Sequence, residues 1–296
     1  MKLLGIQLGA CILSLLPATV SGRPAGESGV DVDKRAAAIS TSVYDDLVYY
    51  FRYASSTYVS TCSKPNGNTL ITRIHDPVTD TQGFIVRDDK RKEFVAAFRG
   101  STTATDWWID ASLALTKFVS TGVNAPAGAS VHTGWLAAWN SVATDVIDTI
   151  REGLEEYPGY SIATTGHSLG GTLSSIAAIS LKQNFQNVTV RMFTYGQPRT
   201  GNSVYADFVN QQLGSKNIFR GVHTLDGAPT MIPITVGYRH HGVEYWQYLE
   251  PSSPFTVRQC NNGGEDITCS TSIPSSGINA YHLAYFGITA GLAYCS

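Results

Sequence analysis

The sequence predicts an α/β fold with a central, mostly parallel β-sheet that is covered by helices on both faces. Three observations lead to this prediction. Short β-prone runs alternate with helical runs, which is typical of parallel sheets. The glycine-rich hexapeptide Gly166–Gly171 joins one such run directly to a helical run. The 296 residues, less a leader of 35, leave 261 residues, which is enough for one domain with a large core.

The first half of the chain supplies a helix, three strands and a second helix. Apolar residues recur at helical spacing over 42–58. β-Branched and aromatic residues then concentrate between turns, which predicts strands at 70–74, 83–86 and 94–98. An amphipathic helix is expected over 135–157, where Pro158-Gly159 ends it.

The second half continues the alternation of strands and helices. The same patterns predict strands at 160–165, 188–195, 218–222 and 243–248, and helices at 169–182, 203–213 and from about Ala280. We find no internal repeat and no low-complexity linker. Residues 36–296 are therefore expected to form a single α/β domain.

The N-terminus has the features of a secretory leader. Lys2 is followed by a mostly apolar run, Leu3–Leu16, and by small residues up to Gly22, so 1–22 is interpreted as a signal peptide. This run is too short for a membrane anchor, which needs about 20 apolar residues. Residues 23–35 end in Lys34-Arg35, which predicts a propeptide cleaved before Ala36. A flexible leader that is never cut is the alternative.

Charge and composition exclude some partners. The leader contains four of the 21 basic and three of the 23 acidic residues, so the remainder has 17 basic against 20 acidic residues. No basic stripe exists, so nucleic acid is not expected as a partner. A hydrophobic content of 43% with no further long apolar run indicates a soluble protein without an integral membrane segment. The secretory leader predicts an extracellular protein, and we expect a monomer.

Four cysteines, Cys62, Cys260, Cys269 and Cys295, remain outside the leader. A secreted chain should pair them, and three connectivities are possible. We favour Cys260–Cys269, which closes a short Asn/Gly-rich loop, together with Cys62–Cys295. A zinc site is the rival, but the spacing lacks C-x-x-C. Asn187 begins an Asn-Val-Thr sequon and is a predicted glycosylation site in a surface turn.

The hexapeptide fits a nucleophile elbow. A strand, Gly-x-Ser-x-Gly and a helix follow one another, and the turn is so sharp that Gly166 and Gly170 avoid clashes beside Ser168. The turn presents the serine hydroxyl above the sheet. A purely structural serine turn is the alternative, but the downstream partners of a nucleophile are also present.

A serine hydroxyl needs a base, and that base needs an orienting acid. In α/β-hydrolase folds the order along the chain is Ser, Asp or Glu, His. Asp226 follows the predicted strand 218–222, and His282 lies near the chain end, so we predict the triad Ser168, Asp226 and His282. The chain order excludes His75, His132, His167 and His223. Asp207 within a helix and Asp266 within the Cys260–Cys269 loop rank lower as acids, and His240 and His241 are interpreted as a surface turn.

Two backbone donors are needed for an oxyanion. The N–H of Leu169 comes with the elbow, and Ser101 leaves the strand that ends at Phe98 and offers both its N–H and its hydroxyl. A helix N-cap is a compatible role for Ser101. The following amphipathic segment contains Trp107, Trp108 and Ile109, and we interpret it as a lid helix. A packed helix with core tryptophans is the alternative.

With these residues in place, the chain resembles the fungal class 3 lipases, which include acylglycerol lipases and type A feruloyl esterases. The motifs that carry the resemblance span nearly the whole mature region: Phe98–Ser101, Thr165–Gly171, Thr194–Asn202, His223–Pro229, Val243–Trp246 and Tyr281–Gly287. It implies an α/β-hydrolase fold, the triad and oxyanion residues named above, a lid after Ser101, both disulfides and no cofactor. No metal ligand set is expected.

The resemblance leaves two substrate classes. Feruloyl esterases of this family have a polar lid segment, whereas this chain has Trp107, Trp108, Ile109 and Leu113. An apolar lid suits long acyl chains at a lipid/water interface. We therefore expect a secreted triacylglycerol lipase that acts on acylglycerol esters, and feruloyl esterase is the alternative.

Overall fold

An eight-stranded sheet lies at the centre of the computed structural model, which describes residues 38–101 and 113–296. The strand order is β1-β2-β3-β6-β7-β9-β11-β12. Neighbours from β3 to β11 are parallel, whereas β1–β2, β2–β3 and β11–β12 are antiparallel. These strands are β1 (Thr69–Asp76), β2 (Thr81–Asp88), β3 (Glu93–Phe98), β6 (Ser161–His167), β7 (Val190–Tyr195), β9 (Ile218–His223), β11 (Glu244–Gln247) and β12 (Val257–Gln259). The predicted α/β class is confirmed.

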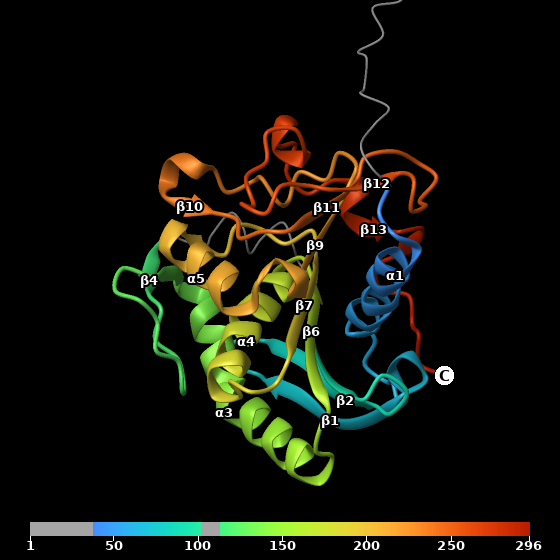
Figure 1. Ribbon diagram of the computed structural model, residues 1–296, viewed down its shortest axis with the longest axis vertical. Coiled ribbons are helices and arrows are strands. Elements are labelled where there is room, and N and C mark those ends of the chain that lie inside the picture. The colour runs from blue at the N-terminus through green and yellow to red at the C-terminus, as the bar shows by residue number, and fades with distance from the viewer. Residues whose placement is uncertain (1–37, 102–112) are drawn as a thin grey trace, which may run out of the picture. The chain divides into compact units, whose positions relative to one another are not determined.

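Helices cover both faces of this sheet (Figure 1). Helix α1 (Thr41–Ser56) packs on one face, and α3 (Thr133–Glu156), α4 (Leu169–Asn184) and α5 (Ser203–Leu213) pack on the other. Side chains alternate along each strand, so a central strand contributes to both cores. In β3, Val95 and Ala97 join the α1 core, whereas Ala96 and Phe98 join the α3–α5 core.

Small side chains allow α4 to lie close to the sheet. Ser174, Ser175, Ala177 and Ala178 are all buried. The hydroxyl of Thr164 in β6 donates to the carbonyl of Ser174 over 3.1 Å. Helix α4 is therefore held tightly behind the strand that leads to Ser168, which fixes the position of the turn between them.

The C-terminal region differs from the prediction. Instead of a helix from Ala280, a 3₁₀ turn (Ala280–Leu283) is followed by a small hairpin of β13 (Ala284–Tyr285) and β14 (Ile288–Thr289). Phe286 and Gly287 have φ values of 52° and 75°, which end any helix and form the hairpin turn. A second sheet, in the order β10-β8-β5-β4, was also not predicted, because its strands β4 (Leu115–Lys117), β5 (Ser130–His132), β8 (Gly201–Asn202) and β10 (Tyr238–Arg239) are too short to give a pattern.

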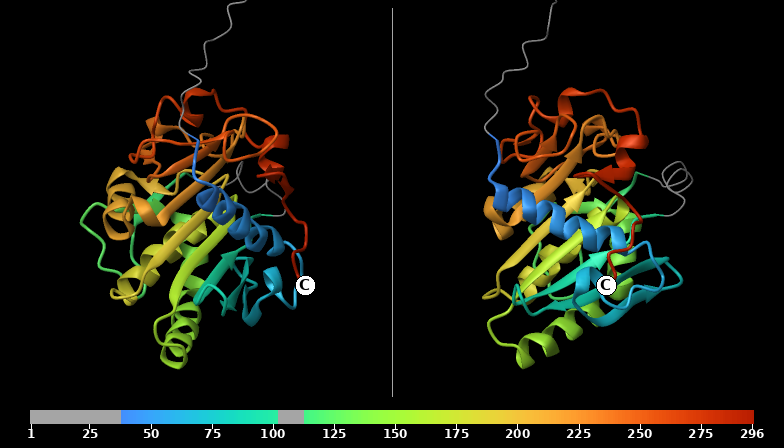
Figure 2. Two further views of the ribbon diagram at one scale, coloured as in Figure 1. Left: turned by 45° about the vertical axis from the view of Figure 1, so that its right-hand side comes forward. Right: turned by 90° about the vertical axis from the view of Figure 1, so that its right-hand side faces the viewer.

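Both favoured disulfides are present. Cys62–Cys295 joins the segment after α1 to the last residues of the chain, with the Cα atoms 5.0 Å apart. Cys260–Cys269 closes the loop after β12. Figure 2 shows the C-terminal segment running beside α1, where the Ser55 hydroxyl donates to the Leu292 carbonyl over 2.8 Å. Among the described residues, no helix has the length and apolar character required to cross a membrane.

Candidate active site

Ser168 lies in a strained turn between β6 and α4. Its backbone has φ 61° and ψ −128°, a conformation that is rare for residues other than glycine. A Cβ on Gly166 would lie 2.0 Å from the Gly170 oxygen, and a Cβ on Gly170 would lie 2.2 Å from the Phe98 oxygen. Only glycine fits at these two positions, which explains the Gly-x-Ser-x-Gly pattern.

The Ser168 side chain is buried at the N-terminus of α4. Its Oγ has no hydrogen-bond partner within residues 38–101 and 113–296, so the hydrogen bond to His282 that the sequence argument requires is not formed. Ser168 and His282 nevertheless line the same cavity of about 270 Å³. In structures without substrate, catalytic hydrogen bonds are often long and shorten only in the complex. The geometry therefore brings nucleophile and base to one cavity.

Asp226 and His282 form a buried pair. The Nδ1 atom of His282 lies 3.0 Å from Oδ2 and 3.1 Å from Oδ1 of Asp226. Asp226 also accepts hydrogen bonds from the Tyr285 hydroxyl and from the Ala228 N–H. Because Nδ1 faces the carboxylate, Nε2 is left to accept a proton.

Asp226 is ionised despite its burial. Burial by itself raises the pKa of this carboxyl group, but the charge and hydrogen bond of His282 and the hydrogen bonds from Tyr285 and Ala228 outweigh it. The pKa of Asp226 therefore lies below its usual value. A carboxylate that is ionised and buried can both orient a histidine and stabilise its protonated form.

The loop after β3 brings Ser101 to the same cavity. A Cβ on Gly100 would lie 2.1 Å from the Tyr58 hydroxyl and 2.6 Å from the His167 oxygen, so this loop is packed directly against the elbow. Leu169 is the first residue of α4, next to the nucleophile. Both predicted oxyanion residues thus lie beside Ser168, whereas the predicted lid residues Trp107, Trp108 and Ile109 lie outside the described residues.

The interpretation of His240 and His241 as a surface turn is wrong, because both side chains are buried. The Nε2 atom of His240 lies 2.7 Å from the Pro229 carbonyl oxygen. His241 lies 3.0 Å from the Ser175 hydroxyl and 2.9 Å from the Gln197 amide nitrogen. The disulfide loop covers this segment, since a Cβ on Gly242 would lie 1.8 Å from the Asn262 oxygen.

The other candidate residues lie where the sequence argument placed them. Asp207 is within α5, and Asp266 is within the Cys260–Cys269 loop. Asn187 is exposed in the turn between α4 and β7. The described residues contain one group with metal-ligand spacing, Glu244 with Cys260 and Cys269, but both sulfur atoms are bonded to each other.

Sequence reasoning missed three residues that contact the Asp226–His282 pair. Tyr285 binds Asp226, and Gly196 approaches the His282 ring so closely that a Cβ would lie 2.7 Å from Cε1. The third, His167, was set aside by chain order alone, yet its Nε2 atom lies 2.7 Å from the His282 carbonyl oxygen. A tyrosine three residues after a predicted catalytic histidine was the available signal for Tyr285.

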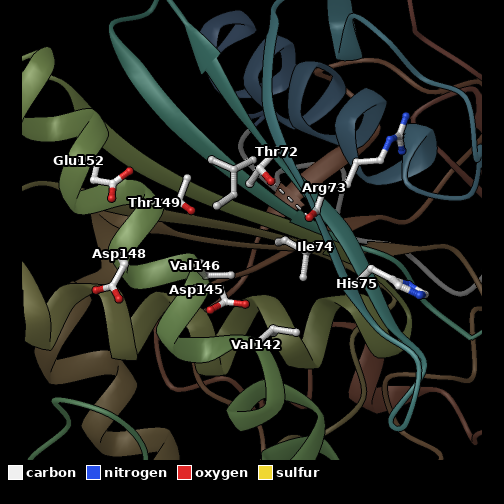
Figure 3. Close-up of a pocket in the computed structure, with 11 residues that line it drawn as sticks. Thr72, Arg73, Ile74, His75, Val142, Asp145, Val146, Asp148, Thr149 and Glu152 are labelled. Carbon is white, nitrogen blue, oxygen red and sulfur yellow. Dashed lines mark hydrogen bonds between the residues drawn. The ribbon is translucent and has the colours of Figure 1, made fainter.

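A larger cavity of about 380 Å³ lies elsewhere, between β1 and α3 (Figure 3). Its walls include the apolar side chains Ile74 and Val146, the basic side chains Arg73 and His75, and the acidic side chains Asp145, Asp148 and Glu152. It contains no nucleophile paired with a base. Size alone therefore does not identify the active site of this protein.

Comparison with known proteins places this geometry in a family. The family model described as lipase (class 3) matches residues 95–236. A secreted alkaline triacylglycerol lipase of Penicillium cyclopium is 34% identical over 270 residues, which cover 90% of this chain and 92% of that protein. The chain belongs to the class 3 lipase family.

Solved structures agree with this membership in the class 3 lipases. The crystal structure of a triacylglycerol lipase from Penicillium expansum has a TM-score of 0.81 and 31% identity, and the match covers 88% of this chain and 99% of that one. A triacylglycerol lipase whose catalytic centre is described as a serine protease triad has a TM-score of 0.76 and 29% identity, with the same coverage. The protein is thus an α/β hydrolase that cleaves carboxylic esters.

Proposed function

We propose that this protein is a secreted triacylglycerol lipase that hydrolyses acylglycerol esters through an acyl-enzyme on Ser168. The observation that carries the proposal is the buried Asp226–His282 pair, which lies at the same cavity as a serine in an elbow conformation. The names of its relatives support the substrate class, since the Penicillium cyclopium and Penicillium expansum proteins are triacylglycerol lipases.

The proposed reaction uses side chains, backbone N–H groups and water. His282 Nε2 takes the proton of Ser168 as the hydroxyl oxygen attacks the ester carbonyl. The N–H of Leu169, together with the N–H and hydroxyl of Ser101, stabilises the negative oxygen, and each such donor contributes about 2.7–4 kcal/mol. His282 then protonates the leaving alcohol, and water attacks the acyl-enzyme by the same sequence of steps.

Apolar surface around the cavity supports a lipid substrate. The cavity is lined by Ile278, Leu283 and Ala290 in addition to the polar residues. Leu283 is 54% exposed, and Ile278 is half-buried. Large apolar side chains on the rim of a site favour contact with an apolar phase over water. We assign the lipid/water interface as the working environment, with Trp107, Trp108 and Ile109 as the lid.

Secretion is part of the proposal. It is supported by the predicted leader over 1–22, by the dibasic end of 23–35 and by the disulfides, which form in oxidising compartments. The Penicillium cyclopium relative is likewise named as secreted. An exposed Asn187 sequon is then available for glycosylation, and we propose that the mature enzyme is a glycosylated monomer.

A substrate panel tests the proposed activity. Purified mature enzyme is assayed on emulsified triolein, tributyrin and methyl ferulate, below and above the solubility limit of tributyrin. We expect turnover of both glycerides, faster above the limit, and loss of at least about 10³-fold in Ser168→Ala. Preference for methyl ferulate would show a feruloyl esterase instead, and full activity of Ser168→Ala would remove the serine mechanism.

A further inference from the structure

His167 occupies the variable position of the elbow, immediately before the nucleophile, and is buried. Its Nδ1 atom lies 2.8 Å from the Tyr58 hydroxyl, and its Nε2 atom lies 2.7 Å from the main-chain oxygen of His282. The His167 and His282 rings are tilted against each other with centroids 4.5 Å apart. One side chain on the elbow therefore contacts both the main chain and the ring of the base.

The partners of His167 fix its tautomer. A carbonyl oxygen can only accept, so Nε2 carries the proton and donates it to His282. Nδ1 then has a free lone pair, and it accepts from the Tyr58 hydroxyl. The result is a directed chain of two hydrogen bonds, from Tyr58 to His167 and from His167 to His282.

His167 also remains uncharged. Burial, and next to it the charge of His282, lower the pKa of His167 to about 3. When His282 is protonated during the reaction, the ring beside it is therefore neutral and does not repel it. A neutral aromatic ring can support the base without disfavouring the charged state on which the reaction depends.

Tyr58 is itself well anchored. It follows α1, whose last turn is joined to the C-terminal segment by the Ser55 bond to Leu292, and Cys62–Cys295 lies four residues further on. The Tyr58 hydroxyl is packed against Gly100 of the oxyanion loop. The hydrogen-bonded chain thus starts from a residue whose segment is joined to the C-terminal segment and packed against the oxyanion loop.

His282, in contrast, lies in a short 3₁₀ turn whose neighbours are exposed. Leu283 is 54% exposed and Tyr281 is 39% exposed. Asp226 orients the imidazole ring, and hydrogen bonds from His223 to the Tyr281 carbonyl and from the His282 N–H to the Asn279 carbonyl hold the turn. None of these bonds joins the turn to the nucleophile elbow. A displacement of about 1 Å in a catalytic group can cost about 100-fold in rate, so the position of this turn relative to the elbow matters for catalysis.

We propose that His167, oriented by Tyr58, is a positioning residue that ties the nucleophile elbow to the main chain of His282 and so sets the approach of the base to Ser168. This assignment rests on the proposed ester hydrolysis. It adds a restraint that joins the base directly to the elbow, independent of Asp226, and gives the variable position of the elbow a role in catalysis.

The test compares variants by the rate at which a p-nitrophenyl alkylphosphonate inactivates the enzyme. In this reaction Ser168 Oγ bonds to phosphorus and p-nitrophenolate leaves, while the serine proton passes to His282. His167→Phe keeps a ring but loses both nitrogens, and we expect inactivation and kcat to fall about 10- to 100-fold with KM nearly unchanged. In Tyr58→Phe we expect the inactivation rate and kcat to fall about 3- to 10-fold. His167→Gln keeps an N–H donor, so its rates should lie between those of His167→Phe and the wild type.

The double variant and the controls separate positioning from general damage. Tyr58 and His167 act in one chain, so Tyr58→Phe/His167→Phe should be no slower than His167→Phe alone. Tyr248→Phe removes a hydroxyl that donates to the Phe255 carbonyl at the surface, and it should leave the rates unchanged. Wild-type rates in His167→Phe, or losses that multiply in the double variant, would overturn the proposal.

A readout without turnover keeps the two proposals apart. NMR of imidazole nitrogens in the inactive Ser168→Ala protein should show His167 as the Nε2–H tautomer. Adding Tyr58→Phe should leave that tautomer in place, because the His282 carbonyl oxygen remains as the acceptor, and should change only the signal of Nδ1, which loses its donor. A His167 in the Nδ1–H form overturns the positioning role even where esterase activity is intact. Conversely, an absence of Ser168-dependent ester hydrolysis in the wild type removes the proposed function, whatever the tautomer. If His167→Phe does not fold, Tyr58→Phe and the tautomer decide.

Discussion

Gly196 is the position at which a single methyl group should act most directly on the base. It follows β7 with φ 57°, and a Cβ there would lie 2.7 Å from Cε1 and 2.8 Å from Nδ1 of His282, and 2.5 Å from the Tyr285 hydroxyl. Gly196→Ala therefore presses on both the base and the tyrosine that binds Asp226.

The size of the effect follows from these distances. Ordinary van der Waals contact begins at 3.4 Å, so the His282 ring must move by about 0.6–0.7 Å. Since a misplacement of about 1 Å costs about 100-fold, we expect kcat to fall about 10- to 100-fold. An alanine at positive φ also costs about 1–2 kcal/mol of folding stability.

The assay measures kcat on a soluble p-nitrophenyl ester, corrected by active-site titration, together with urea unfolding. Gly159→Ala is the matched control, because Gly159 has φ 90° and a Cβ there would meet nothing within 4 Å. It should lose stability and keep its kcat. The reasoning from ring displacement fails if Gly196→Ala retains the wild-type kcat within twofold. It also fails if the kcat of Gly159→Ala falls as much as that of Gly196→Ala.

Three further predictions concern stability and modification. Burial lowers the pKa of His241 to about 3, so the folded state binds fewer protons than the unfolded state below about pH 6.5. The free energy of unfolding should therefore fall as the pH drops from about 6.5 towards 3. In His241→Gln, the slope of this free energy against pH, measured by urea unfolding, should decrease by about 1.4 kcal/mol per pH unit. An unchanged slope contradicts this prediction. The double variant Cys62→Ser/Cys295→Ser opens a loop with a sequence separation of 233. Urea unfolding should show that the free energy of unfolding falls by about 3–5 kcal/mol. A decrease below about 1 kcal/mol would mean that this disulfide does not constrain the unfolded chain as the loop-entropy argument requires. Enzyme secreted from a eukaryotic host should decrease in mass when it is treated with an endoglycosidase. The Asn187→Gln variant should show no such decrease, and a decrease that remains in the variant would place the glycan at another residue.

The sequence alone determined the features that depend on neighbouring residues. Alternating strands and helices predicted the sheet, and the glycines around Ser168 predicted a turn that excludes side chains. Chain order, together with the position of Asp226 after a predicted strand and of His282 near the chain end, selected this pair, because the topology of this fold returns these loops to the same edge of the sheet.

Only the tertiary structure decided contacts between segments that are far apart in the chain. The burial of His240 and His241 depends on a disulfide loop that covers them, and no local pattern records it. The contacts of Tyr285 with Asp226 and of His167 with His282 join residues 59 and 115 positions apart. Periodicity reports which face of an element is buried, whereas the partner of a buried polar group is set by packing in three dimensions.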